Sequence, residues 1–251
     1  MTDAFGLAAL LFLTAVLYTA AGQAGASGYL AVMAVYGLAP DDMRPAALVL
    51  NLVASAVTAA RFRSAGHFDR GLFLPLALGS IPSALIGGFL SLPEAVYRPL
   101  LAAVLLAAAV WLAWPKSANR TGSGCEDGER ARRMPIWARV VSGAAVGLLA
   151  GLTGVGGGVF LMPLLLLGRW VGEQEAAGVT AAFILVTSAA GLIGRLAAVP
   201  ALPDQMPLWI GVVAAGGLIG STLGSRFLSG LTLRRLLAVV LVIVVGKLLF
   251  G

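Results

Sequence analysis

The sequence has little charge and almost none of the side chains that build catalytic and metal centres. It contains one cysteine, Cys125, and one histidine, His67. A single thiol excludes a disulfide, a thiol pair for electron transfer and a cysteine metal cluster. One histidine without carboxylates in the apolar segments gives no ligand set for a transition metal. We therefore expect no cofactor.

Apolar residues and glycine are abundant instead. Of the 251 residues, 59% are hydrophobic and a further 33 are glycine, while 11% are charged. Soluble domains contain about 45–50% of apolar residues and glycine together, so a soluble globule is excluded. The apolar runs are long enough to cross a bilayer, and the chain is predicted to be an all-α polytopic membrane protein with about eight membrane segments.

The basic residues lie in short loops beside these apolar runs. The formal net charge is +6 and the pI is about 10.2. The placement of the basic residues is typical of charges that orient a membrane protein. We therefore expect no nucleic-acid partner. The segment Phe5–Ala21 lacks a preceding basic region, so we expect a retained first membrane segment rather than a signal peptide. A multi-pass protein of the bacterial inner membrane is predicted.

A polar, basic stretch divides the chain into two halves of similar length. We assign residues 1–114 to the first half, 115–139 to a linker and 140–251 to the second half. The halves resemble each other when aligned. Gly25 then stands opposite Gly156, and Asn51 stands opposite Thr180. These matches predict an internal duplication.

Each half begins with an apolar stretch that is interrupted by residues of low helix propensity. Phe5–Leu38 is interrupted at 22–28, and Trp137–Val171 is interrupted at 153–158. Each glycine costs a helix about 1 kcal/mol, so both stretches are predicted to break. Three uninterrupted spans are expected after each break: Pro45–Phe62, Leu72–Leu92, Val96–Trp114, Ala176–Val199, Pro207–Leu228 and Leu233–Phe250.

The distribution of lysine and arginine favours inverted repeats. If each repeat crosses the membrane an odd number of times, 13 of the 17 basic residues lie on one side. If each broken stretch crosses once, the parallel arrangement collects 11 of them. The positive-inside rule therefore predicts the inverted arrangement.

The two breaks are the candidate substrate sites. Non-helical backbone at membrane depth is tolerated where it is covered by protein or lines a wet cavity. A helix that begins after a break offers free N–H groups to an anion, which predicts an anion site without buried arginine or lysine. The alternative is that the glycines only allow helices to pack closely. The predicted substrate-binding residues are Gln23, Gly25, Ser27, Asn51, Thr153, Gly154, Gly156, Gly157, Gly158 and Thr180.

Polar side chains within the spans are the next candidates. Asn51, in the middle of its span, is predicted to donate to an oxyanion together with Thr180; a hydrogen bond between helices is the alternative. The hydroxyls of Ser55, Thr58, Thr187 and Ser188 are expected to bond mainly to their own helices. Arg195 is expected to extend to the membrane interface, and His67 to lie in a solvated loop.

The segment Leu148–Leu165, together with Gly168 and Ala176–Thr180, closely resembles the signature of the TauE/SafE family of sulfite and sulfonate permeases. The first half resembles a degenerate copy of it. The resemblance implies a secondary transporter of small anions, of the sulfite, sulfonate or sulfoacetate class, with alternating access at a site between the breaks. The alternative substrate is a small carboxylate or another inorganic anion. Coupling to protons or sodium and assembly as a homodimer are further possibilities that the sequence leaves open.

Two other classes of function are alternatives to transport. Residues 25–28 match the Gly-x-Ser-Gly motif of intramembrane serine proteases. A serine nucleophile needs a base within hydrogen-bond reach, but His67 lies in a loop and the duplicate of Ser27 is Gly158. We therefore expect no enzyme. A membrane scaffold without transport is the second alternative, and it needs no broken helices.

Overall fold

The computed structural model describes residues 2–20, 23–90, 92–113, 135–168, 170–198 and 202–226. Within these ranges the regular structure is helical throughout, which confirms the all-α prediction. The helices are α1 (Thr2–Ala20), α2 (Ala26–Val35), α3 (Pro40–Ser64), α4 (Arg70–Phe89), α5 (Glu94–Ala113), α7 (Ile136–Thr153), α8 (Gly158–Leu167), α9 (Glu173–Ala198) and α10 (Met206–Arg226). The predicted span Leu233–Phe250, Cys125 and most of the predicted linker lie outside the described residues.

Helix α3 begins five residues earlier than the predicted span. Pro40 occupies the first turn, where its missing N–H costs nothing, and Asp41 and Asp42 favour the positive end of the helix dipole. Pro45 therefore lies inside the helix. The next helix, α4, is capped by Asp69, whose carboxylate accepts hydrogen bonds from two main-chain N–H groups in the first turn.

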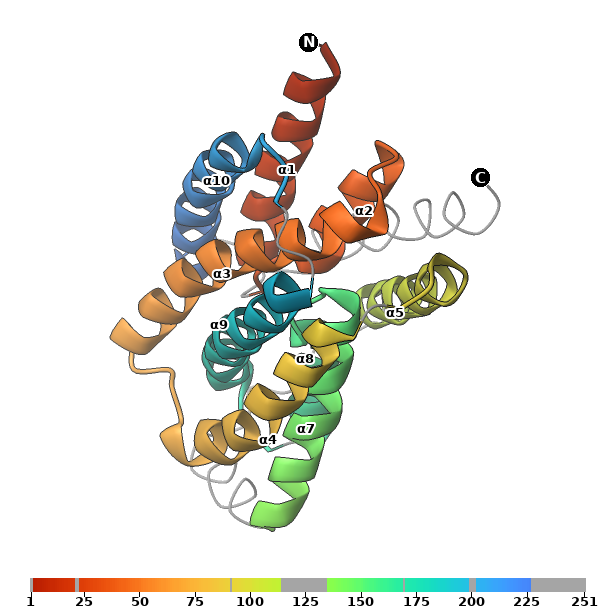
Figure 1. Cartoon of the computed structure of the whole chain (residues 1–251). Coiled ribbons are helices and arrows are strands. Elements are labelled where there is room, and N and C mark those ends of the chain that lie inside the picture. The colour runs from red at the N-terminus through yellow and green to blue at the C-terminus, as the bar shows by residue number, and fades with distance from the viewer. Residues whose placement is uncertain are drawn as a thin grey trace.

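Helices α3 and α9 lie side by side and run antiparallel through the centre of the molecule (Figure 1). Asp41 at the start of α3 contacts Arg195 near the end of α9. At the opposite end, the Cβ of Phe62 lies close to Gly178 near the start of α9. These two long helices therefore form a central pair, which α2, α4, α7, α8 and α10 contact.

The helices on either side of this pair exchange partners between the two halves. Helix α4 packs against α7 and α9, while α10 packs against α1 and α3 (Figure 1). The α4–α7 contact is close because small residues recur every four positions on α7. Backbone atoms of Leu76, Ser80 and Ala84 lie directly over these positions, which are Gly143, Gly147 and Gly151. Such spacing lets membrane helices approach closely.

Five described helices, α3, α4, α7, α9 and α10, are long and apolar enough to cross a membrane. Shorter apolar helices accompany them at Phe5–Ala20, Ala26–Val35 and Ala95–Ala107. The outer face of α4 exposes large apolar side chains, including Leu74 at 58% and Leu78 at 70%. An apolar outer surface of this kind suits contact with lipid chains.

Candidate substrate site at the second helix break

The second break falls where the glycine run predicts it. Helix α7 ends at Thr153, and α8 begins at Gly158. Gly154 ends α7 with φ 78°, and Gly156 and Gly157 also adopt positive φ values, of 74° and 78°. Side chains other than glycine rarely adopt this left-handed conformation, so the glycines allow the chain to turn out of one helix and into the next.

Three polar side chains from the central helix pair meet around this break. Asn51 Nδ2 donates to the Val155 carbonyl at 3.3 Å, and any side chain at Gly156 would collide with that amide nitrogen. Ser188 Oγ lies 3.0 Å from the position of a Cβ atom at Gly156, and a methyl carbon of Thr180 lies 3.3 Å from one at Gly158. Gly156 thus lies against polar groups of α3 and α9, whereas Gly158 lies against Ile184 and the methyl group of Thr180.

These side chains retain unused hydrogen-bonding capacity although they are fully buried. Asn51, Thr180 and Ser188 are each 0% exposed. Asn51 Oδ1, Thr180 Oγ1 and Ser188 Oγ have no hydrogen-bond partner in the described part of the chain. Buried polar atoms are nearly always paired, so three unpaired atoms at one break indicate a place for a polar ligand.

The start of α8 adds main-chain donors. Phe160 N and Leu161 N bond to the Gly157 carbonyl, and among the described residues the N–H groups of Gly158 and Val159 make no such backbone bond. The first N–H groups of a helix have no partner within it and carry partial positive charge. The arrangement can therefore bind a small anion.

Two of the predicted residues do not belong to the group of unpaired polar side chains. Thr153 Oγ1 donates to the Leu149 carbonyl at 2.7 Å and accepts from Val155 N at 3.3 Å, so its hydroxyl is occupied in ending α7. A Cβ atom at Gly157 would meet Phe183 Cε1 at 2.9 Å and Val146 Cγ1 at 3.1 Å. Gly157 therefore faces apolar side chains and not the polar group around Asn51.

The first break is filled by the chain's own tyrosines. Ser27 Oγ donates to Tyr18 Oη at 3.0 Å, and Tyr29 Oη donates to the Ala24 carbonyl at 2.8 Å. Gly25, with φ 98°, lies against the Tyr29 ring and the Tyr18 Cβ atom. Gln23 is buried beside them. No hydrogen bond described in the chain joins Gln23, Gly25 or Ser27 to the second break, but Ala24 and Val155 belong to one continuous hydrophobic core.

Arg195 lacks the solvent exposure that was expected of it. Its side chain is fully buried, and Nη2 donates to Asp41 Oδ1 because the antiparallel packing of α3 and α9 brings the two residues together. Arg44 is also buried, and its backbone lies against Gly154, with Cα 3.3 Å from the position of a Cβ there. Arg44 thus places a buried arginine against the break, where the predicted site contained none.

Sequence reasoning missed Arg44 as a buried cation beside the break. Its guanidinium lies 5.6 Å from the centre of the Tyr97 ring, and Tyr97 Oη donates to the Thr153 carbonyl at 3.1 Å. The available signal was an arginine directly before Pro45 at the start of a long apolar run. Because the acidic residues Asp41 and Asp42 precede it, the cluster resembles an exposed helix start.

A family model described as sulfite exporter TauE/SafE matches residues 7–248. The chain belongs to the TauE/SafE family. It is also 41% identical over 249 residues to the probable membrane transporter protein y4hK of Sinorhizobium fredii (strain NBRC 101917 / NGR234), which covers 99% of both chains. No solved structure matches it. The protein is thus a multi-pass membrane transporter and not an enzyme.

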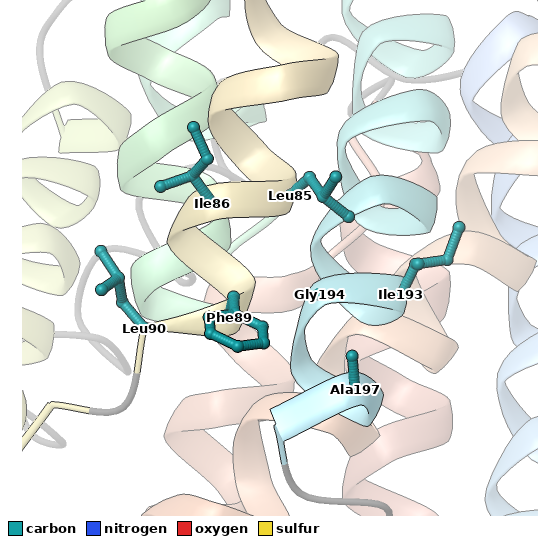
Figure 2. Close-up of a pocket in the computed structure, with 7 residues that line it drawn as sticks. All are labelled: Leu85, Ile86, Phe89, Leu90, Ile193, Gly194 and Ala197. Carbon is teal, nitrogen blue, oxygen red and sulfur yellow. The ribbon is translucent and has the colours of Figure 1, made fainter.

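One groove of this TauE/SafE transporter lies outside the polar site. It has a volume of about 330 Å³ between α4 and α9 (Figure 2). Its lining is apolar apart from glycine, and Phe89 and Ile193 are strongly exposed. A surface without polar side chains offers nothing to an anion, so this groove is suited to lipid chains rather than to the transported substrate. The full lining is Leu85, Ile86, Phe89, Leu90, Ile193, Gly194 and Ala197.

Proposed function

We propose that the protein is a secondary transporter of small anions, most specifically sulfur oxyanions or organosulfonates of the sulfite, sulfonate and sulfoacetate class. The observation that carries this proposal is the group of buried, unpaired polar atoms of Asn51, Thr180 and Ser188 at the start of α8. The unpaired hydroxyls of Thr180 and Ser188 can donate to an oxyanion beside this helix start, whereas the unpaired Asn51 Oδ1 only accepts and suits a protonated oxygen of the ligand. The name of the matched family, sulfite exporter, supports the choice of sulfur chemistry.

Alternating access between two inverted repeats is the proposed mechanism. Helices in corresponding positions have similar lengths, with 10 residues in each of α2 and α8 and 25 and 26 in α3 and α9. Equivalent helices of inverted repeats cross the membrane in opposite directions, and the antiparallel α3–α9 pair is consistent with this. The pairing of α4 with α7, and of α10 with α1, has the same reciprocal character.

The site is proposed to form around the second break, with the first break as its counterpart across the shared core. The residues 1–114 then make up the first repeat, 115–139 a linker and 140–251 the second repeat. Opening and closing would change which side of the membrane reaches Asn51 and Gly156. Coupling to protons or sodium, a homodimer and residence in the bacterial inner membrane stay predictions.

A thermal-shift titration of the detergent-purified protein tests the substrate class. The panel contains sulfite, sulfate, thiosulfate, sulfoacetate and small carboxylates, with choline and glycerol as cationic and neutral controls. A ligand at 100 times its Kd stabilises the folded state by about 2.7 kcal/mol. A shift with sulfur oxyanions, followed by their flux in proteoliposomes, would support the proposal. A shift only with carboxylates would change the substrate, and no anion flux at all would favour a scaffold.

A further inference from the structure

Arg44 is a buried cation without a carboxylate partner in the part of the chain that the structure describes. The residue is 2% exposed, and its Nη2 atom lies 3.1–3.4 Å from the carbonyl oxygens of Gly87, Leu90 and Gly151. Its Nε atom has no partner among the described residues. Arginine stays protonated in proteins, and a charge inside a membrane protein generally serves a function. This guanidinium is therefore placed to attract a counter-ion.

Arg195 brings a second guanidinium into the same region. It is fully buried, whereas the side chain of its partner Asp41 is 73% exposed. The charges of Arg195 and Asp41 both act on Arg44. The three groups form one electrostatic cluster between the start of α3 and the end of α9, which we call the arginine cluster. The carboxylate in this cluster lies at the surface, so water can solvate it when an incoming anion replaces it at Arg195.

The arginine cluster lies two helical turns from the Asn51 site. Arg44 precedes Asn51 by seven residues on α3, and Arg195 follows Ser188 by seven residues on α9. Seven residues return to the same helix face about 10 Å away. The second break lies beside both the arginine cluster and the Asn51 site, because Gly154 lies against Arg44 and Gly156 lies against Asn51 and Ser188.

We propose that Arg44 and Arg195 form a second anion-binding position, through which the small oxyanion passes on its way to the Asn51 site. When no anion is present, the Asp41 carboxylate forms an ion pair with Arg195. The incoming oxyanion then replaces this carboxylate. Guanidinium groups bind oxyanions through paired charge-assisted hydrogen bonds. Tyr97 holds Arg44 in place through its ring and through its bond to Thr153. This inference rests on the proposed function and extends its site.

The test measures sulfite flux into proteoliposomes as a function of sulfite concentration. Arg44→Gln is expected to raise the KM at least tenfold, and Arg44→Lys to restore part of it because the charge returns. Asp41→Asn is expected to lower the KM, since it removes the internal competitor for Arg195. Asp42→Asn is the matched control, because Asp42 is an exposed neighbour outside the arginine cluster, and its KM should equal that of the wild type.

An unchanged KM in Arg44→Gln would overturn the proposal, and so would a raised KM in Asp41→Asn, which would make the ion pair a structural tie between α3 and α9. If Arg44→Gln fails to reach the membrane, Asp41→Asn alone decides. Its KM should fall if Asp41 competes with the anion for Arg195, and rise if the ion pair only holds α3 and α9 together. Wild-type protein that carries no anion removes the proposed function together with this inference. If the wild type transports sulfite and Arg44→Gln has the same KM, this inference is wrong but the proposed function stands.

Discussion

The side-chain amide of Asn51 donates to the main-chain carbonyl of Val155 at 3.3 Å, across 104 residues of sequence. This bond ties the middle of the long helix α3 to the non-helical segment between α7 and α8. The same amide nitrogen carries a second hydrogen that can donate to an anion, and Oδ1, which has no partner in the described structure, can accept from a protonated ligand oxygen. A substitution at Asn51 should therefore weaken substrate binding directly, and not only by destabilising the fold.

Asn51→Ala is expected to weaken sulfite binding at least tenfold and to destabilise the protein by about 1–3 kcal/mol, because the buried Val155 carbonyl loses its partner. Ser55→Ala is the control. Ser55 is equally buried on α3, but its hydroxyl bonds to the Leu52 carbonyl of its own helix at 3.2 Å. A binding titration of both variants checks the prediction, and equal affinities would remove Asn51 from the site.

Gly156→Ala should abolish transport, because the new methyl group would collide with the Asn51 amide and would lie 3.0 Å from Ser188 Oγ. Positive φ alone costs an L-residue roughly 1–2 kcal/mol. Gly66→Ala controls for that cost, since Gly66 has φ 81° with no atom within 4 Å of a Cβ. Sulfite flux per protein reconstituted should vanish in the first variant and persist in the second. Retained flux in Gly156→Ala would argue against a site at this break.

Gly157→Leu is a weaker test of the same site. A side chain at Gly157 would collide with Phe183 and Val146 in the apolar core, away from Asn51. Loss of transport in that variant would follow from disturbed packing alone. The smaller change at Gly156 is therefore the sharper experiment.

Tyr18→Phe is expected to leave transport intact and to destabilise the protein by about 0.5–1.5 kcal/mol, since it removes only the hydrogen bond from Ser27. Ser27→Ala should have a similar effect, and the double variant should cost less than the sum of the two, because both remove one interaction. Thermal denaturation and sulfite flux check the cycle. Loss of flux in Tyr18→Phe with unchanged stability would instead give the first break a direct part in transport.

The breaks and most helix bounds were predictable because their causes are local. Each glycine costs a helix about 1 kcal/mol, so a break within residues 153–158 is predictable from that segment alone. Long apolar runs likewise locate α4, α9 and α10 to within a few residues. These features depend on composition within a single segment.

The arginine cluster was not predictable in this way. Asp41 and Arg195 lie 154 residues apart, and only the antiparallel packing of α3 and α9 brings them together. An arginine near the end of an apolar run usually extends to the interface, so the local pattern at Arg195 favoured the wrong environment. The same packing places Ser188, predicted mainly to bond to its own helix, beside Gly156.

Gly147→Ala is expected to destabilise the protein by about 1–3 kcal/mol, because a methyl group there would lie 2.6 Å from Ser83 Oγ and press on the Ser80 backbone of α4. Gly211→Ala on α10 is the matched control. No atom lies within 4 Å of a Cβ at that exposed position, so alanine should raise helix stability by up to about 1 kcal/mol. Opposite shifts in the midpoint of thermal unfolding would establish that α7 glycines set the α4–α7 distance. A neutral Gly147→Ala would mean that the two helices can separate without cost.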